Sequence, residues 1–359
     1  MADDLDLDMA IEPLTPAPQP SEPATAAAAS ATPEPNEGGN KSRSVTRVQP
    51  GFITPEGAGA RVSRSIGLPS LWNLSPFLIL DYCDIEPGQG FPDHPHRGMA
   101  TVTMVLDGQV THEDHLGHTG TLGQGDLQWM IAGRGLVHSE MPVGAARALQ
   151  LWIDLPAARK MMKPRYVDRK SSQIPSVPLL DSSSAEVGSA RVIAGEVGDT
   201  KGSVRDTVNE ILLLDLTLRG ETFVAVPASW TCFVYATEGS ISVGGKKVKA
   251  QECAVLSTSE GETGVHIEAG GKGARVLLGA SPPLHQELVM QGPFAVTSRD
   301  AAGKALADFR DGRNGFEKAL GWRSKTGQAV SSGAKGKGGK GGKGKKAKRG
   351  RRGDDSDDD

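Results

Sequence analysis

The chain has 359 residues, enough for two domains of ordinary size, and a formal net charge of −3. Its three cysteines, Cys83, Cys232 and Cys253, form no CxxC pair, and their odd number excludes the disulfide framework of small secreted domains. No apolar run approaches the ~18 residues of a membrane span, and no signal-peptide pattern is present. We therefore expect a protein of a reducing compartment, nucleus and/or cytoplasm, that does not act in a membrane.

The two ends of the chain differ from its middle. Residues 1–42 are rich in Pro and Ala, and the first forty residues carry eight acids and no Lys or Arg, which predicts a disordered tail. Residues 325–359 carry eleven basic residues followed by five aspartates, which predicts a second disordered tail. The region between the tails is close to neutral, so we expect no direct sequence-specific DNA binding by the core.

Along the middle, short β-branched and apolar runs alternate with Gly-rich turns. "TVTMVLDGQVTHED" (101–114) has two alternating runs around Asp107-Gly108, which predicts a β-hairpin. "ALQLWIDL" (148–155) predicts another short strand, ended by Pro156. A polar connection broken by prolines follows.

A second β-rich block then extends to about residue 285, with turn signals every ~8–12 residues, as in a barrel or sandwich. The one good helical pattern covers 298–320, with Ser298 as a plausible N-cap. We predict an all-β fold of two tandem units, each a barrel or a sandwich, with a C-terminal helix, flanked by the two tails. The predicted boundaries are 43–170 for the first domain and 171–324 for the second, with the helix in the second.

Six of the eight histidines lie between residues 94 and 138. In "FPDHPHRG" (91–98) an extended backbone places His94 and His96 on one face, because side chains two apart on a strand point the same way. In "GRGLVHSEMP" (133–142) the same spacing pairs His138 with Glu140. Three imidazoles and a carboxylate can surround a metal ion and leave two octahedral positions open, as a catalytic site requires. This N/O set suits Fe, Mn, Ni, Cu or Zn.

These residues also carry a family resemblance. "FPDHPHRGMATVTMVLDGQ", "GDLQWMIAGRGLVHSEMP", "LQLWIDLP" and, near the other end, "GRNGFEKAL" resemble the pirin family over roughly residues 45–320. The resemblance implies a bicupin, two double-stranded β-helix barrels, whose N-terminal barrel holds one iron, most simply Fe²⁺, through His94, His96, His138 and Glu140. The second barrel has no HxH, so we expect no metal there.

The resemblance leaves three functions open. The first is a quercetin 2,3-dioxygenase type of enzyme, which opens a flavonol-like aromatic substrate with O₂ and releases carbon monoxide, with Glu140 as a base. The second is a nuclear iron- or redox-dependent co-regulator that acts through transcription-factor partners. The third is a cupin that binds a small molecule without turnover. "KGKKAKRGRR" (343–352) is either a nuclear-localisation patch or a solvated tail, and Ser356 in "DDSDDD" suits an acidophilic kinase.

The remaining candidates have simpler readings. His112, His115 and His118 are expected to be solvated, or hydrogen-bonded to Glu113 or Asp114. The alternative places one of them behind a ligand imidazole, with His112 and His118 as the candidates. Phe91 and Leu136 are candidates for an apolar pocket wall near the metal. Trp129 and Met130 are expected in the barrel core, and Cys83 as a small buried hydrophobe.

Overall fold

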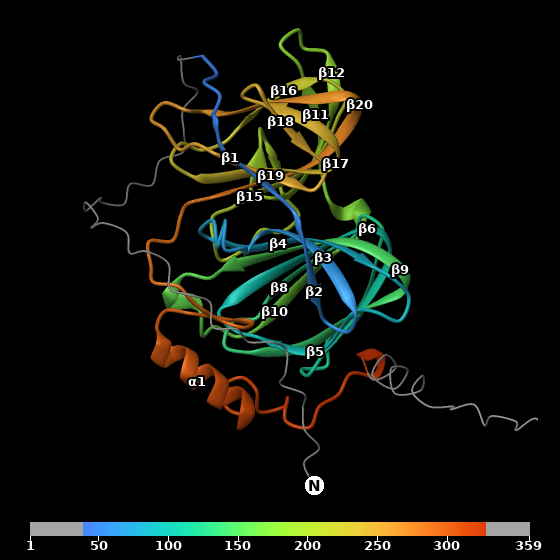
Figure 1. Ribbon diagram of the computed structural model, residues 1–359, viewed down its shortest axis with the longest axis vertical. Helices are drawn as coiled ribbons and strands as arrows, with labels where there is room; N and C mark the ends of the chain where they lie inside the picture. Colours follow the sequence, from blue (N-terminus) through green and yellow to red (C-terminus); the bar gives the residue numbers. More distant parts are fainter. Residues whose placement is uncertain (1–38, 328–359) are drawn as a thin grey trace, which may run out of the picture.

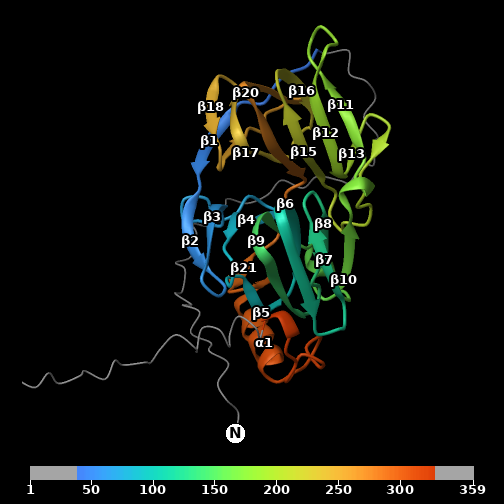
Figure 2. The ribbon, with the colours of Figure 1, turned by 90° about the vertical axis from the view of Figure 1, so that its right-hand side faces the viewer.

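Two curled sheets of nine strands each account for most of the structure, a computed structural model that describes residues 39–327. Each sheet closes into a barrel of the cupin type, and the two barrels are stacked along the long axis of the molecule (Figure 1). Turned by 90°, the lower barrel is blue to green and the upper barrel is mostly yellow to orange (Figure 2). The all-β prediction with two barrels is confirmed.

The first sheet has the order β10-β8-β6-β9-β4-β3-β2, with β5 paired to β9 and β7 paired to β6. Its strands are β2 (Phe52–Glu56), β3 (Ala60–Ile66), β4 (Phe77–Ile85), β5 (Phe91–His96), β6 (Met99–Asp114), β7 (Thr119–Gly123), β8 (Leu127–Ile131), β9 (Leu136–Asp154) and β10 (Arg165–Arg169). Of two 3₁₀ turns, η1 (Ala157–Arg159) lies between β9 and β10 of the first sheet, and η2 (Ser171–Gln173) lies on the connection to the second sheet.

The second sheet has the order β1-β19-β17-β20-β15-β12-β11, with β16 paired to β20 and β18 paired to β17. Its strands are β1 (Val45–Pro50), β11 (Ser176–Leu180), β12 (Glu186–Ala194), β15 (Leu212–Leu218), β16 (Glu221–Ala225), β17 (Thr231–Val243), β18 (Lys246–Lys249), β19 (Glu252–Leu256) and β20 (Gly264–Ser281). Two small hairpins, β13 (Glu196–Val197) with β14 (Thr200–Lys201) and β21 (Val289–Gln291) with β22 (Phe294–Val296), precede the helix α1 (Arg299–Arg310).

The strands of the first sheet have one polar and one apolar face. Thr103 of β6 is in register with Gln128 of β8 and Gln150 of β9, so these three polar side chains share a face. Their sequence neighbours point the other way and form a core with residues of the second barrel. This core joins Leu80, Val102, Trp129, Leu149 and Leu151 to Ile193, Leu213, Phe233, Tyr235 and Leu277. The polar face is therefore left to line the inside of the first barrel.

The Asp107-Gly108 hairpin prediction is wrong. β6 is one 16-residue strand that pairs with β9 on both sides of Gly108. The register shifts between Val105 and Asp107 and again between Gly108 and Val110, and Gly108 has φ of +73°. Gly108 thus lies at β-bulges that bend a long strand. A glycine in the left-handed region is needed both in such a bulge and in a hairpin turn, so the sequence pattern alone does not distinguish the two.

The predicted domain boundaries assign segments to the two barrels in chain order, and the structure departs from that order at both ends. β1 precedes the strands of the first sheet in the chain but pairs with β19 of the second sheet. α1 packs near the first barrel instead, where Phe294 and Phe316 share a buried cluster with Val137 of β9. The boundaries 43–170 and 171–324 place β1 with the first barrel and α1 with the second, whereas β1 pairs in the second sheet and α1 packs near the first barrel. In Figure 1, β1 reaches the upper barrel and α1 lies below the lower one.

The helix begins as predicted and ends earlier. The Ser298 hydroxyl accepts a hydrogen bond from the backbone N–H of Ala301, which confirms the N-cap. α1 ends at Arg310, and Gly312 follows with φ of +64°, so the residues to 320 form turns rather than helix.

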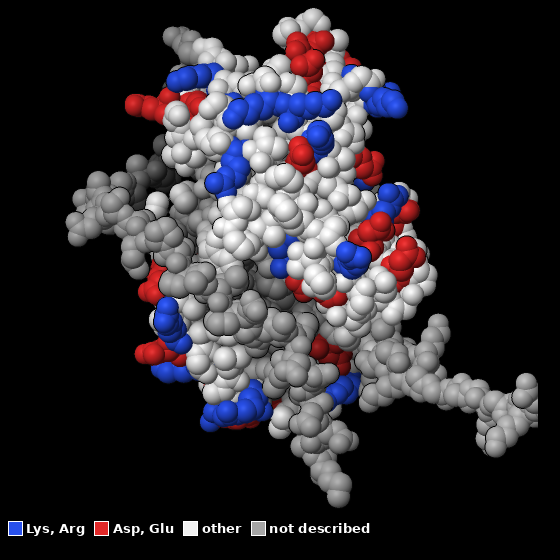
Figure 3. Space-filling model, viewed as in Figure 1, with Lys and Arg blue, Asp and Glu red and all other residues white. Residues whose placement is uncertain are grey.

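On the face of the molecule in Figure 3, basic and acidic side chains are interspersed, apart from a short row of basic side chains on the upper barrel. The exposed lysines of β18, Lys246, Lys247 and Lys249, belong to that barrel. The near-neutral charge of the middle region is thus spread over both signs rather than divided into patches on this face.

Candidate metal centre

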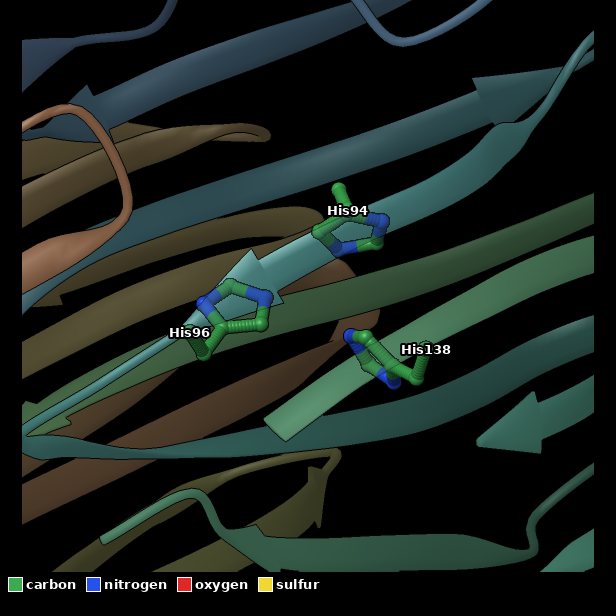
Figure 4. Close-up of side chains that lie close together, drawn as sticks. All are labelled: His94, His96 and His138. Atoms are coloured by element: carbon green, nitrogen blue, oxygen red, sulfur yellow. The ribbon is translucent and has the colours of Figure 1, made fainter. Parts of the chain in front are cut away.

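The cluster of three histidines is set by the antiparallel pairing of β5 with β9. His94 lies directly across from His138, and His96 lies two residues further along β5. Pro95 occupies the alternate position and does not interrupt the pairing, since it pairs with Val137. Figure 4 shows the three rings turned toward one another, two from β5 and one from β9.

The three rings lie at ligand-like separations. Ring centroids are 4.5 Å apart for His94 and His138, 4.9 Å for His94 and His96, and 5.1 Å for His96 and His138. One ring nitrogen from each residue lies within 4.8 Å of the others. A single cation between the rings could therefore be reached by all three imidazoles.

Burial keeps two of these imidazoles neutral. His138 and His96 are 0% and 1% exposed. Burial lowers the pKa of each well below 6.5, and the neighbouring histidines lower it further. A neutral imidazole has a free lone pair, which is the form that binds a metal.

Hydrogen bonding sets the tautomer of His94. Its Nδ1 lies 2.8 Å from the carbonyl oxygen of Pro92. A carbonyl only accepts, so Nδ1 carries the proton and donates it, and Nε2 keeps its lone pair. A backbone carbonyl that orients a ligand histidine in this way is typical of metal sites.

The buried ring nitrogens fit a metal ion. In the described part of the chain, Nδ1 of His96 and both ring nitrogens of His138 have no hydrogen-bond partner. Buried polar atoms without partners are uncommon and costly, and coordination would satisfy them.

Glu140 lies beside His138, outside the group of three residues whose ligand atoms lie within 4.8 Å of one another. Its Oε2 is 3.8 Å from Nε2 of His138. Oε1 accepts a hydrogen bond of 2.7 Å from the Thr103 hydroxyl, and Oε2 accepts one of 2.9 Å from the Gln150 amide. These two bonds hold the carboxylate against the polar face of the barrel, with lone pairs left for another partner.

Thr103 and Gln150 are site residues that the sequence analysis missed. The available signal is the appearance of single polar residues in otherwise apolar strands, as in "TVTMV" (101–105) and "LQLW" (149–152). Such residues face the barrel interior by alternation. Their link to Glu140 depends on strand register, which no short motif encodes.

His112 and His118 form a group of their own with Asp168, and this group is separate from the three ring ligands of the first cluster. The expectation that His112 and His115 are solvated is wrong, because His112 is 1% exposed and His115 is 5% exposed. His115 has a structural role: its Nδ1 accepts from the N–H of Val137 at 3.1 Å, and its Nε2 lies 3.2 Å from the carbonyl of Gly315.

The apolar candidates lie on the same strands as the histidines. Phe91 is in register with Glu140 and packs on a small cluster that contains Cys83. Leu136 is in register with His96 and is fully buried with Met130. Trp129, Met130 and Cys83 are all buried, as expected. Outside this barrel, His285 is exposed, and the side chain of His266 is 44% exposed.

The C-terminal segment is hydrogen-bonded to β5 and β6, two of the strands that carry histidines. The backbone N–H of Ser324 donates to the carboxylate of Asp93, next to His94. The Thr326 hydroxyl donates to Glu113, next to His112, at 2.7 Å.

Residues 343–352 and Ser356 lie outside the described residues, so the nuclear-localisation and phosphorylation hypotheses stay predictions. Within residues 39–327, no helix is long and apolar enough to cross a membrane.

Comparison with known proteins agrees with this geometry. Residues 59–153 match the family described as Pirin, and residues 212–315 match the Pirin C-terminal cupin domain. Pirin of Homo sapiens is 41% identical over 283 residues, which cover 76% of this chain and 94% of that protein. A pirin-like protein of Solanum lycopersicum is 40% identical over 277 residues, 75% of this chain and 92% of that one.

The solved structures similar to this chain include the crystal structure of a quercetin 2,3-dioxygenase from Acinetobacter baumannii. It aligns with a TM-score of 0.68 and 29% identity, over 76% of this chain and 98% of that one. Both halves of the match, the barrel with the histidines and the second cupin, lead to one conclusion. The chain belongs to the pirin family.

Proposed function

We propose that this protein is a mononuclear metal protein that acts as a dioxygenase of the quercetin 2,3-dioxygenase type. His94, His96, His138 and Glu140 would hold the ion, and iron is the metal we expect first, with Ni, Mn, Cu and Zn as the other metals that this donor set accepts. The observation that carries the proposal is the convergence of three rings, of which two are buried and have nitrogens that lack other partners. The similarity to a quercetin 2,3-dioxygenase supports the substrate class.

A bound metal ion would supply positive charge that lowers the pKa of a flavonol hydroxyl and activates the ring toward O₂. The chain's own contribution centres on Glu140, whose carboxylate is 4% exposed. Its Oε2 would accept the proton of the flavonol 3-hydroxyl, and the bonds from Thr103 and Gln150 would hold it in position for that transfer. One flavonol and one O₂ would then yield one ring-opened ester and one carbon monoxide.

Burial gives the second contribution. His96, His138 and Glu140 are each at most 4% exposed, so water has little access to the reacting atoms. In such surroundings, fixed dipoles and charges act more strongly than in bulk water.

The test measures O₂ consumption and carbon monoxide release with quercetin, using protein loaded separately with each of the five metals. We expect equal amounts of O₂ consumed and carbon monoxide released with at least one metal, at a rate far above that of the free ion. His138→Ala should abolish turnover, whereas His266→Ala, on the exposed surface of the other barrel, should not.

A rate equal to that of the free metal would contradict the enzyme proposal. If the metal is bound fully and no phenol in a panel stimulates O₂ uptake, the protein would instead be a cupin that binds a small molecule without turnover.

A further inference from the structure

A second group of metal-ligand side chains lies in the same barrel. Nε2 of His112, on β6, is 3.4 Å from Oδ2 of Asp168, on β10. Nε2 of His118, in the turn between β6 and β7, is 3.8 Å from the same oxygen. The three ligand atoms all lie within 4.8 Å of one another. This arrangement joins β6 and the turn that follows it to β10, which is distant in sequence.

His112 is the strongest sign that the group binds something. Its side chain is 1% exposed, and neither ring nitrogen has a hydrogen-bond partner among the described residues. A buried imidazole pays the full desolvation cost of its polar atoms when they remain unbonded. The ring faces Asp168, with which it makes its one close polar approach in the described structure.

Space for a ligand is left by a glycine. Gly120 of β7 lies across from His112 in the strand register. A Cβ at Gly120 would lie 2.6 Å from Nε2 of His112 and 3.5 Å from Oδ2 of Asp168. Any larger residue would therefore intrude on the space between these two atoms.

The surrounding residues hold the group in place. Oδ1 of Asp168 accepts a hydrogen bond of 3.1 Å from the Gln128 amide, which leaves Oδ2 turned to the histidines. The ring of Tyr166 stacks on that of His118, with centroids 4.1 Å apart and planes 5° from parallel. Support of this kind for ligand side chains is common around metal ions.

We propose that His112, His118 and Asp168 bind a second divalent transition-metal ion. Two imidazoles and one carboxylate are a donor set for borderline ions such as Zn²⁺ or Co²⁺, with a water in the fourth tetrahedral position. His112 on β6 is also the register partner of Glu140 on β9, so the two centres meet across this pair of neighbouring strands. The second ion would place positive charge near the first centre.

The alternative is a salt bridge without any metal, in which a protonated His112 bonds directly to Asp168. The two cases differ in metal stoichiometry, which we would measure by equilibrium dialysis of metal-free protein against Co²⁺. We expect two ions per chain for the wild type. His118→Ala, at a side chain 38% exposed, should reduce the number to one.

Gly120→Ala should also reduce it to one, because the added methyl enters the space beside Nε2 while all three ligands stay. Gly303→Ala is the matched control, since a Cβ at this helix position meets nothing within 4 Å, and it should keep two ions. His138→Ala removes a ligand of the first centre and should leave the second ion bound.

The proposal is overturned if the wild type binds one ion and His138→Ala removes it, or if His118→Ala retains two. Should Gly120→Ala fail to fold, the stoichiometry of His118→Ala decides alone. None of these results depends on dioxygenase activity, so this proposal and the proposed function fail separately.

Discussion

His94, His96 and His138 differ in how the chain prepares each ring. His94 has its tautomer set by the Pro92 carbonyl, whereas His96 and His138 are kept neutral by burial. The HxH and HxE spacings predict which side chains share a face, because alternation along a strand is a local property. The identity of the residues that hold Glu140 depends on which strands are neighbours, and that is a property of the whole sheet.

Thr103→Val tests the support of Glu140. Valine keeps the shape of threonine and removes the hydroxyl that donates to Oε1 at 2.7 Å. We expect metal affinity or turnover to fall about 10- to 100-fold, as is usual when a residue behind a ligand is lost. Thr111→Val, on the same strand but bonded to Thr121, should leave both unchanged. Equal losses in the two variants would mean that the effect comes from the strand and not from Glu140.

Among the elements, β6 and α1 show where sequence patterns were read incorrectly. The Asp107-Gly108 pair has the composition of a hairpin turn, yet β9 continues alongside it and makes it a bulge. For α1, local signals predicted the cap at Ser298 correctly, because capping involves only neighbouring residues. Its packing against the first barrel combines a buried apolar cluster with the ion pair of Arg97 with Asp308, 211 residues apart.

This ion pair lies next to the metal centre in the chain, since Arg97 follows His96. Arg97 donates to Asp308 at 2.9 Å and to the Asn314 carbonyl at 2.9 Å, and its guanidinium lies 4.9 Å from the Phe316 ring centroid. Asp308→Ala leaves a buried cation without its partner, so we expect a loss of about 3 kcal/mol in the free energy of unfolding. Asp311→Ala, whose pair with Arg310 is exposed, should cost less than about 1 kcal/mol.

The Arg97–Asp308 pair also predicts a pH dependence. Burial alone would raise the pKa of Asp308, but the hydrogen bonds from Arg97 and Asn314 lower it below its ordinary value of 3.8. The unfolded carboxyl therefore binds protons first as the pH falls, so this stabilisation is complete above about pH 4 and is lost below it. Urea denaturation between pH 3 and pH 7 should show that the free energy of unfolding of the wild type falls in acid, and that this fall is smaller in Asp308→Ala. An equal fall in the free energy of unfolding in both proteins would mean that other carboxylates cause the effect.

At the scale of the whole molecule, the two barrels share one core. Phe77 of the first barrel meets Phe233 of the second edge to face, with centroids 4.9 Å apart. Composition and turn spacing predict two all-β units correctly, because each unit is built from short alternating strands. They do not predict that β1 joins the far barrel or that α1 packs near the first, since both depend on contacts between distant parts of the chain.

We infer that three histidines of the first barrel surround one metal ion. The decisive experiment is an anomalous difference map, recorded at the iron absorption edge from crystals of the iron-loaded protein. We expect a peak between the rings of His94, His96 and His138, with Glu140 beside it. An iron-loaded crystal with no peak there, or with its main peak at the exposed His266, would rule out this metal site.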